Sequence, residues 1–207
     1  VHGVSLGEVN LMPALVAPLE AATGARCLLT TSTATGRERL DALFPQHARG
    51  YLPFDLPWAA ERFLRTVRPR ALVLLELELW PQLLARCHAR GIPVLLVNAR
   101  VGAGSFRGWR RAGAIARPLL RPLALALAQN GTWAARLRAL GVRAARVSGS
   151  LKADMVRPAE PGAAAALAAR LGLDPARPLL LVASTSAGAV AEEQVALAEG
   201  VAAWAAR

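Results

Sequence analysis

Short apolar runs alternate with amphipathic stretches along most of the chain, and this alternation limits the possible folds more than any other feature of the sequence. The expected strands are the apolar runs 1–5, 27–33, 71–79, 92–99, 123–129 and 145–150. The expected helices cover residues 8–22, 36–43, 58–68, 81–90 and 132–141, with a loop over 44–57. Strands that are apolar along their whole length and alternate with helices are typical of parallel sheets. The sequence therefore predicts an α/β fold, with a parallel sheet covered by helices on both faces.

The chain is long and apolar enough to bury a core. Its 207 residues, of which 54% are hydrophobic and 19% charged, suffice for one large domain or one and a half smaller ones. The longest apolar stretch, residues 118–129, is interrupted by Arg121 and Pro122 and is shorter than the ~20 residues that span a bilayer. The two cysteines form neither a disulfide framework nor a metal-binding spacing. We therefore expect no membrane-spanning helix, no zinc site and a reducing compartment.

A change of composition after residue 155 predicts a domain boundary. A helical pattern over 163–172, a strand over 177–185 and a further helical pattern over 186–200 follow a proline-rich joint. We expect a first domain over 1–155, a linker over 156–162 and the beginning of a second α/β domain over 163–207. Because the chain starts in a strand-like run and stops in an alanine-rich helical pattern, we also expect coding sequence on both sides of it.

Gly7 and Glu8 lie in the turn that joins the first expected strand to the first expected helix. Gly7 allows a close approach of the backbone, and the free N–H groups of a helix start attract anions. Glu8 would lie at the carboxyl end of a parallel strand, where open α/β sheets bind their ligands. Alternatively, Glu8 complements the helix dipole, and because acidic residues are common at helix starts the pattern alone favours this explanation. The turn lacks the G-x-G-x-x-G fingerprint of dinucleotide sites.

Hydroxyl groups and a glycine gather at the next junction between a strand and a helix, over residues 30–39. With Thr35, Gly36 and two arginines, such a loop can hold a sugar or a phosphate. The segment can equally be an ordinary helix start with Thr35 as the N-cap, and the pattern alone favours this simpler interpretation.

Two carboxylates, Glu76 and Glu78, follow a buried apolar run. If the strand continues through them, both side chains point to one face of the sheet. Burying them without partners would be costly, and Arg100, at the matching end of the next strand, is a plausible counter-ion. A structural salt bridge and a functional site at the carboxyl edge both remain open.

The positive charge is concentrated in one part of the chain. Lysine and arginine number 25 against 14 acidic residues, and ten arginines but no acidic residue lie between Arg100 and Arg146. Because Phe106 and Trp109 are interspersed with these arginines, the segment fits a surface that meets anionic lipid headgroups. A nucleic-acid surface or a plain solvated face would have the same charge, but no nucleic-acid-binding motif is present.

The only lysine, Lys152, follows the last expected strand of the first domain. A compact ammonium group at this place could stabilise a developing negative charge. On the residue count alone this is a weak signal, and a solvated loop lysine is the default explanation.

Taken together, several stretches resemble the 3-deoxy-D-manno-octulosonic acid (Kdo) transferases of lipopolysaccharide synthesis. They occur in the order and at about the spacing found in that family, and they cover essentially the whole chain: HGVSLGE, TTSTATGRER, YLPFDLP, ELELWP, IPVLLVNAR, SFRGW, LAQN, SGSLKAD and ASTS. YLPFDLP, ELELWP and VNAR in series are far more specific than any one of them alone.

The resemblance implies an inverting glycosyltransferase of the GT-B fold, with two Rossmann-like domains, that needs neither a metal nor another cofactor. It implies transfer of Kdo from the donor CMP-Kdo to a lipid A precursor (lipid IVA) at the cytoplasmic face of the bacterial inner membrane. Attachment there is peripheral or through an N-terminal anchor. The chain resembles the acceptor domain followed by the start of a truncated donor domain, and we expect it to be inactive alone.

By position, Glu8 matches the family's catalytic base, Glu76 an essential carboxylate that stabilises the transition state, and Lys152 a second transition-state stabiliser. Arg100 is expected in a supporting role. The further substrate contacts that we expect are Gly7, Thr35, Gly36, Ser184 and Thr185. The chain departs from the family near the donor site, where Ser186 stands at the position of an expected histidine and extra residues precede Glu192.

Two hypotheses of other classes compete with the enzyme. The arginine-rich segment could make this a non-catalytic α/β module that binds anionic glycolipid or phosphate, with affinity that weakens in salt and does not depend on Glu8 or Glu76. A nucleic-acid binder would show a steep salt dependence with oligonucleotides, and we expect no nucleic-acid partner.

Overall fold

A computed structural model of the chain describes residues 1–156, 158, 160–174, 176–177, 179 and 198–202, without the side chains of residues 114–116. The contacts divide the chain into two units, Val1–Val156 and Arg157–Arg207. The first unit contains the sheet and most of the predicted site. In the second, the helix expected over 163–172 is present as α10 (Ala163–Arg170). The strand expected over 177–185 and most of the helix expected over 186–200 lie outside the described residues.

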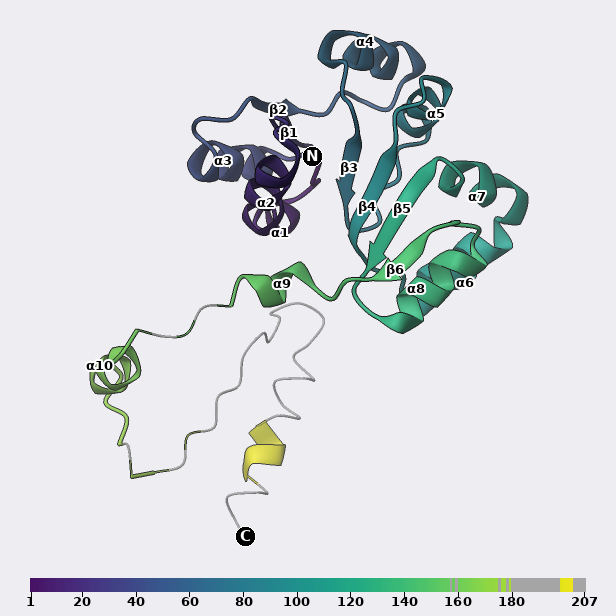
Figure 1. Cartoon of the computed structure of the whole chain (residues 1–207). Coiled ribbons are helices and arrows are strands. Elements are labelled where there is room, and N and C mark those ends of the chain that lie inside the picture. Colours follow the sequence, from purple (N-terminus) through teal and green to yellow (C-terminus); the bar gives the residue numbers. More distant parts are fainter. Residues whose placement is uncertain (157, 159, 175, 178, 180–197, 203–207) are drawn as a thin grey trace. The chain divides into compact units, whose positions relative to one another are not determined.

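The first unit is built on parallel strands, and all but one of those that the structure describes there lie within the predicted apolar runs (Figure 1). One parallel pair joins β1 to β2, and β3, β4, β5 and β6 form a parallel set in that order. The strands are β1 (Leu29–Thr31), β2 (Arg49–Tyr51), β3 (Leu72–Leu75), β4 (Val94–Ala99), β5 (Leu123–Ala128) and β6 (Ala145–Val147). The predicted fold class, a parallel α/β sheet with flanking helices, is confirmed for this unit.

The first residues of the chain join the two sets of strands. His2 forms parallel bridges with Thr30 of β1 and with Leu74 of β3. Its backbone N–H donates to the carbonyl of Val73 at 2.8 Å, and Leu75 donates back to the His2 carbonyl at 3.0 Å. The strand order is therefore β2, β1, the His2 segment, β3, β4, β5 and β6. The order reverses direction between the His2 segment and β3, and this is the topological switch point of the sheet.

Helices cover both faces of the sheet. Successive strand residues point to opposite sides, and because both sets of side chains are apolar, both faces must be covered. Leu72 and Leu74 pack into one hydrophobic cluster, and Val73 and Leu75 into another. The first cluster contains residues of α4 (Pro57–Val67), α5 (Pro81–Ala89), α7 (Gly113–Leu120) and α8 (Gly131–Ala139), with α6 (Ala103–Arg111) packed against it. The second contains residues of α1 (Leu6–Val9), α2 (Pro13–Thr23) and α3 (Ala34–Leu43).

Several element boundaries differ from the prediction. The helix expected over 8–22 is interrupted, because Pro13 starts α2 and the chain turns between α1 and α2. The short strand β2 lies in the segment expected to be a loop, and α6 and α7 occupy a stretch in which no element is predicted. Thr33, not Thr35, is the N-cap of α3, and its side-chain oxygen accepts a hydrogen bond from the N–H of Gly36 at 3.1 Å.

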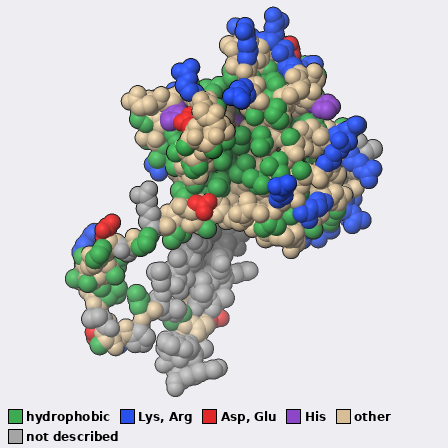
Figure 2. Space-filling view, in the orientation of Figure 1, with side chains coloured by type: hydrophobic (Ala, Val, Ile, Leu, Met, Phe, Trp, Pro, Cys, Tyr) green, Lys and Arg blue, Asp and Glu red, His purple; other side chains and the backbone are tan. Residues whose placement is uncertain are grey.

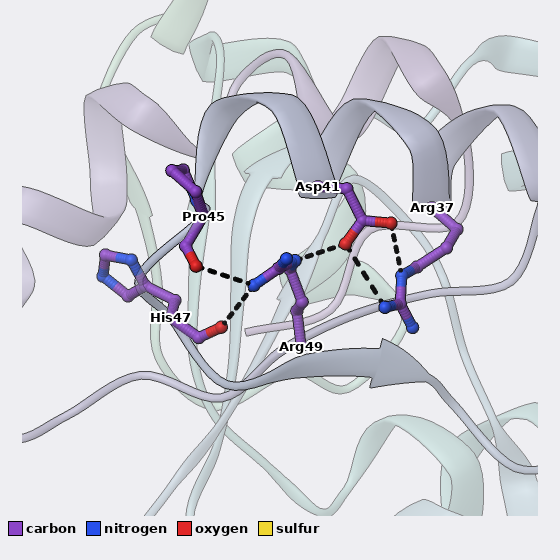
Figure 3. A network of polar contacts seen from close by, with 5 residues as sticks. All are labelled: Arg37, Asp41, Pro45, His47 and Arg49. Carbon is purple, nitrogen blue, oxygen red and sulfur yellow. Dashed lines mark hydrogen bonds and ion pairs between the residues drawn. The ribbon is translucent and has the colours of Figure 1, made fainter.

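A small polar network fixes α3 against the start of β2 (Figure 3). Asp41 of α3 accepts hydrogen bonds from Arg37, at 3.0 and 3.2 Å, and from the Arg49 guanidinium. Arg49 also donates to the carbonyls of Pro45 at 3.1 Å and His47 at 3.0 Å. These interactions close the turn that leads from α3 into β2.

Candidate active site

Three carboxylates lie at the carboxyl edge of the sheet, on the two sides of the switch point. Glu8 follows the His2 segment, and Glu76 and Glu78 follow β3. Open α/β sheets bind their ligands in the crevice at this position. The carboxylates are close enough for the charge of Glu76 to raise the pKa of Glu8, and for the charges of Glu8 and Glu76 to raise that of Glu78. The structure therefore brings Glu8 and Glu76 close together, as expected if both belong to the same site.

Glu8 is a buried carboxylate held in one orientation. Only 8% of the residue is exposed. One carboxylate oxygen accepts from the backbone N–H of Val4, and the other accepts from the hydroxyl of Ser5 at 3.0 Å. Burial raises the pKa of Glu8, the two hydrogen bonds oppose this shift, and the negative charge of Glu76 adds to it. Because the carboxylate keeps unused lone pairs, it can still accept a proton from a bound ligand.

The loop that holds Glu8 is fixed by the next junction of strand and helix. The Val4 carbonyl accepts from the hydroxyls of Thr31 at 2.9 Å and Thr33 at 3.2 Å. Gly36 packs directly behind these hydroxyls, and a Cβ atom there would lie 2.3 Å from Thr31 Oγ1. The segment 30–39 therefore supports the Glu8 loop, and the N–H of Gly36 is already bonded to Thr33. Thr35 is exposed beside it.

The segment after β3 does not continue the strand, so this part of the prediction is wrong. β3 ends at Leu75, and Glu76 has a left-handed backbone with φ of 57°. The chain therefore turns away at Glu76, and the alternation expected of a strand does not apply to Glu76 and Glu78. Leu77, Leu79 and Trp80 pack against the core, which anchors the turn that carries the two acids.

We expect Glu78→Gln to stabilise the first unit by more at about pH 8 than at about pH 4. Burial, followed by the charges of Glu8 and Glu76, raises the pKa of Glu78 above that of the unfolded chain. Its ionised form therefore destabilises the folded state above the folded pKa, and this cost disappears as the pH falls below the unfolded pKa. Urea denaturation of both proteins at the two pH values measures the difference. An equal effect at both pH values would contradict this account of the site.

Arg100 is not the counter-ion of these acids. Its guanidinium lies over the ring of Trp133, 5.7 Å from the ring centre, and the residue is exposed. Within residues 1–156, neither Glu76 nor Glu78 takes part in an ion pair. Arg100 follows β4 and Trp133 belongs to α8, so this cation–π contact joins the end of β4 to α8. Arg100 therefore does not neutralise the charge of Glu76 or Glu78.

Lys152 lies in the short helix α9 (Leu151–Asp154), which follows β6 at the same edge of the sheet. The hydroxyl of Ser150 caps this helix by accepting from the N–H of Lys152 at 3.3 Å. Leu151 packs into the cluster that also contains α1 and α2, whereas Lys152 is exposed. The ammonium group is thus available to a ligand at the carboxyl edge.

Two residues that fix neighbouring elements, His2 and Asp55, were not singled out from the sequence. His2 is fully buried, its Nδ1 lies 3.0 Å from Thr30 Oγ1, and its ring meets the Trp80 ring edge-on at 5.6 Å. Burial lowers the pKa of His2 to about 4, so this ring is neutral at physiological pH. Asp55 accepts from the N–H groups of Gln82 at 3.0 Å and Leu83 at 2.9 Å. Asp55 therefore caps α5 from the YLPFDLP loop, which ties that motif to ELELWP.

In the arginine-rich segment, the aromatic side chains of α6 contact the core of the unit, and Phe106 also contacts neighbouring arginines. Phe106 and Trp109 of α6 pack against the unit's own core, while Arg107, Arg110 and Arg111 of the same helix are exposed. Figure 2 shows basic side chains gathered on the side of the unit where α6 and α7 lie. The predicted mixture of arginine and aromatic side chains is present, because Phe106 and Trp109 are half-buried and the guanidinium groups of Arg110 and Arg136 lie 5.7 and 5.8 Å from the centre of the Phe106 ring. Whether this surface meets anionic lipid stays a prediction.

A cavity of about 830 Å³ lies at the opposite edge of the sheet. It is lined by residues just before β1, β2 and β3, together with Glu20, Cys27 and His47. None of the predicted site residues lines it. Because ligands of open α/β sheets bind at the carboxyl edge, we place the candidate site at the carboxylates.

Two further observations bear on cofactors and membranes. Among the described residues, no three histidine, cysteine, aspartate or glutamate side chains are grouped closely enough to hold a metal ion. In the same part of the chain, every helix is too short or too polar to cross a bilayer. Ser184 and Thr185, the predicted donor contacts, lie outside the described residues.

The order of the strands and the switch point between them define a Rossmann-like α/β domain. Residues 1–155 match the family described as 3-Deoxy-D-manno-octulosonic-acid transferase (kdotransferase). The chain belongs to this family of glycosyltransferases, and its first unit is the N-terminal domain of their GT-B fold. The resemblance drawn from the motifs is thereby confirmed.

Individual relatives agree with this assignment. A 3-deoxy-D-manno-octulosonic acid transferase of Bordetella pertussis is 41% identical over 197 residues, covering 91% of this chain and 44% of the relative. A Haemophilus influenzae protein of the same name is 32% identical over 75% of this chain and 37% of its own. A probable mitochondrial 3-deoxy-D-manno-octulosonic acid transferase of Arabidopsis thaliana is 34% identical, and the match covers 69% of this chain and 31% of the relative. The chain therefore spans less than half the length of these relatives.

Proposed function

We propose that the protein transfers Kdo from CMP-Kdo to a lipid A precursor, lipid IVA, in lipopolysaccharide synthesis. The single observation that carries this proposal is the buried, oriented carboxylate of Glu8 at the switch point, with Glu76 and Glu78 beside it. The names of the relatives from Bordetella and Haemophilus support the sugar that is transferred. The donor, the acceptor and the stereochemistry are parts of the proposal.

In the proposed reaction, Glu8 acts as the general base. The acceptor hydroxyl attacks the anomeric carbon of Kdo while Glu8 takes its proton, the bond to the CMP phosphate breaks, and CMP leaves with the electron pair. One such displacement inverts the anomeric centre. Because burial raises the pKa of Glu8, its carboxylate is a stronger base than an exposed one, which suits proton abstraction near neutral pH.

Glu76 and Lys152 complete the proposed machinery. The negative charge of Glu76 contributes to the raised pKa of Glu8, and so keeps that carboxylate basic. An ammonium group at Lys152 would stabilise the negative charge that develops on the leaving phosphate. The proposal assigns no metal ion or other cofactor to these steps, and Ser184 and Thr185 remain predicted donor contacts.

We further propose that the protein works at the cytoplasmic face of the inner membrane. The exposed arginines of α6 would attract anionic headgroups, since each basic residue near such a surface adds about 1 kcal/mol. Two apolar side chains that follow β2 are also exposed and could contact lipid: Phe54 is 85% exposed and Trp58 is 68% exposed. The same basic surface favours the second candidate, a non-catalytic module for anionic glycolipid, whose binding would not need Glu8.

The deciding experiment is a transfer assay. The chain is expressed together with the coding sequence that flanks it, and is incubated with CMP-Kdo and lipid IVA. The proposal expects a Kdo-bearing lipid of inverted anomeric configuration by NMR, formed equally well in excess EDTA. Absence of transfer, together with salt-sensitive binding to anionic liposomes, would favour the binding module instead.

We expect Gly7→Ala to raise the KM for the lipid acceptor without lowering the melting temperature. Gly7 is exposed in α1, and a Cβ atom there would meet only Ser5 Oγ, at 3.7 Å. Alanine therefore fits the folded chain and gains up to about 1 kcal/mol in a helix. A KM unchanged from that of the parent protein would show that no substrate approaches the backbone at Gly7.

A further inference from the structure

Asn98 has an unusual backbone near the carboxyl end of β4. Its φ is 58°, in the left-handed region that asparagine tolerates better than most residues other than glycine, and it is only 1% exposed. The residue belongs to the VNAR motif, two positions before Arg100, and it has no role in the proposed chemistry so far.

The side chain and backbone of Asn98 connect the ends of β4, β5 and β6. Its side-chain Oδ1 accepts from the backbone N–H of Leu151 at 3.1 Å. Its backbone carbonyl accepts from the side-chain amide of Gln129 at 3.0 Å, and the Gln129 N–H donates to the Ala99 carbonyl at 3.2 Å. The VNAR, LAQN and SGSLKAD motifs therefore meet in one set of hydrogen bonds.

The bond from Leu151 to Asn98 lies at the first residue of α9, next to the Ser150 cap. Leu151 is the first residue of this helix, and the N–H groups of a first turn have no partner within the helix. A helix of four residues has little stability of its own. Asn98 satisfies the first of these N–H groups from a buried position on the sheet, and the next residue along the chain is Lys152.

We propose that Asn98 is a positioning residue that holds α9 so that Lys152 reaches the reacting groups. This inference rests on the proposed function, because it takes Lys152 as a group that acts at the site. Asn98 touches no reacting atom in this proposal. It acts through the Leu151 N–H, and the left-handed backbone aims its side chain along the carboxyl edge.

The first test measures the bond itself by amide hydrogen exchange at Leu151. Asn98→Gly keeps the left-handed backbone but removes the acceptor, whereas Asn98→Asp keeps an acceptor oxygen. We expect Leu151 to exchange about tenfold faster or more in the glycine variant, and to stay protected in the aspartate variant. Exchange at Leu96, in the middle of β4, is the internal control. Unchanged exchange at Leu151 in Asn98→Gly would overturn the proposal.

The second test uses transfer activity in the protein expressed with its flanking coding sequence. We expect Asn98→Gly to lower kcat by roughly tenfold to a hundredfold, because a small displacement of a positioned group costs up to about that much. The KM for the acceptor should stay nearly constant, and Asn98→Asp should recover most of kcat. If Asn98 had only a structural role, the glycine variant would yield less folded protein, and the folded fraction would have the kcat and the KM of the parent.

A double-mutant cycle distinguishes action through Lys152 from other effects. If Asn98 works through Lys152, adding Asn98→Gly to Lys152→Ala lowers kcat no further than Lys152→Ala alone. Fully additive losses would overturn the proposal. If the parent protein transfers no Kdo, the proposed function fails, whereas altered exchange at Leu151 would still identify Asn98 as the residue that holds α9.

Discussion

Glu8→Gln is expected to lower Kdo transfer by about 10²–10⁴-fold, the usual contribution of a positioned general base. The amide has the size of the carboxylate, its oxygen can accept from the Val4 N–H, and its NH2 group can donate to the Ser5 hydroxyl, but it cannot take a proton. The loss should therefore fall on kcat, measured by the rate of CMP release with saturating donor and acceptor.

Stability measurements separate this loss from a folding defect. Because burial raises the pKa of Glu8, its ionised form costs the folded state stability above that pKa, and the neutral glutamine does not carry this cost. We expect Glu8→Gln to be at least as stable as the parent at about pH 8. Glu38→Gln, in the exposed part of α3, is the matched control and should change neither quantity. Full transfer activity in Glu8→Gln would refute the mechanism.

Gly36→Ala is expected to destabilise the first unit by about 1–3 kcal/mol, the usual cost of overpacking a buried position. The added Cβ would lie 2.3 Å from Thr31 Oγ1 and 2.8 Å from Thr33 Oγ1, so one hydroxyl must move. Both hydroxyls donate to the Val4 carbonyl, and the Val4 N–H donates to the Glu8 carboxylate. The substitution should therefore also lower transfer activity by loosening the Glu8 loop.

Gly104→Ala provides the control for this second prediction. Gly104 lies within α6, and a Cβ atom there would have no neighbour within 4 Å, so alanine should be neutral or stabilising by up to about 1 kcal/mol. Urea denaturation gives the stability of both variants. If Gly36→Ala is as stable as the parent, the packing behind Thr31 and Thr33 does not support the loop as described.

Much of the fold could be predicted, because local patterns determine it. The apolar runs are long enough to identify β3, β4 and β5 from periodicity alone. The position of the His2 segment in the middle of the sheet could not be derived, because it depends on pairing with Thr30 and Leu74, which lie far along the chain. Periodicity identifies strands but carries no information about their order.

The site was predicted in part for the same reason. Glu8 and Glu76 follow strands, and the carboxyl ends of parallel strands meet at one edge, so their proximity follows from local sequence. The left-handed turn at Glu76 and the stacking of Arg100 on Trp133 depend on tertiary packing. The contact between Asn98 and Leu151 joins residues 53 positions apart, and no spacing rule describes it.

The central place of the His2 segment has a consequence for how the unit assembles. Two groups of strands, β1 with β2 and β3 to β6, are connected within the sheet only by the bridges of His2 among the described residues. A variant in which residues 1–3 cannot pair would expose two unpaired strand edges in the interior of the unit, where β1 and β3 would recruit other chains. Substitutions in residues 1–3 therefore act on the middle of the sheet, and we expect those that prevent pairing to promote aggregation.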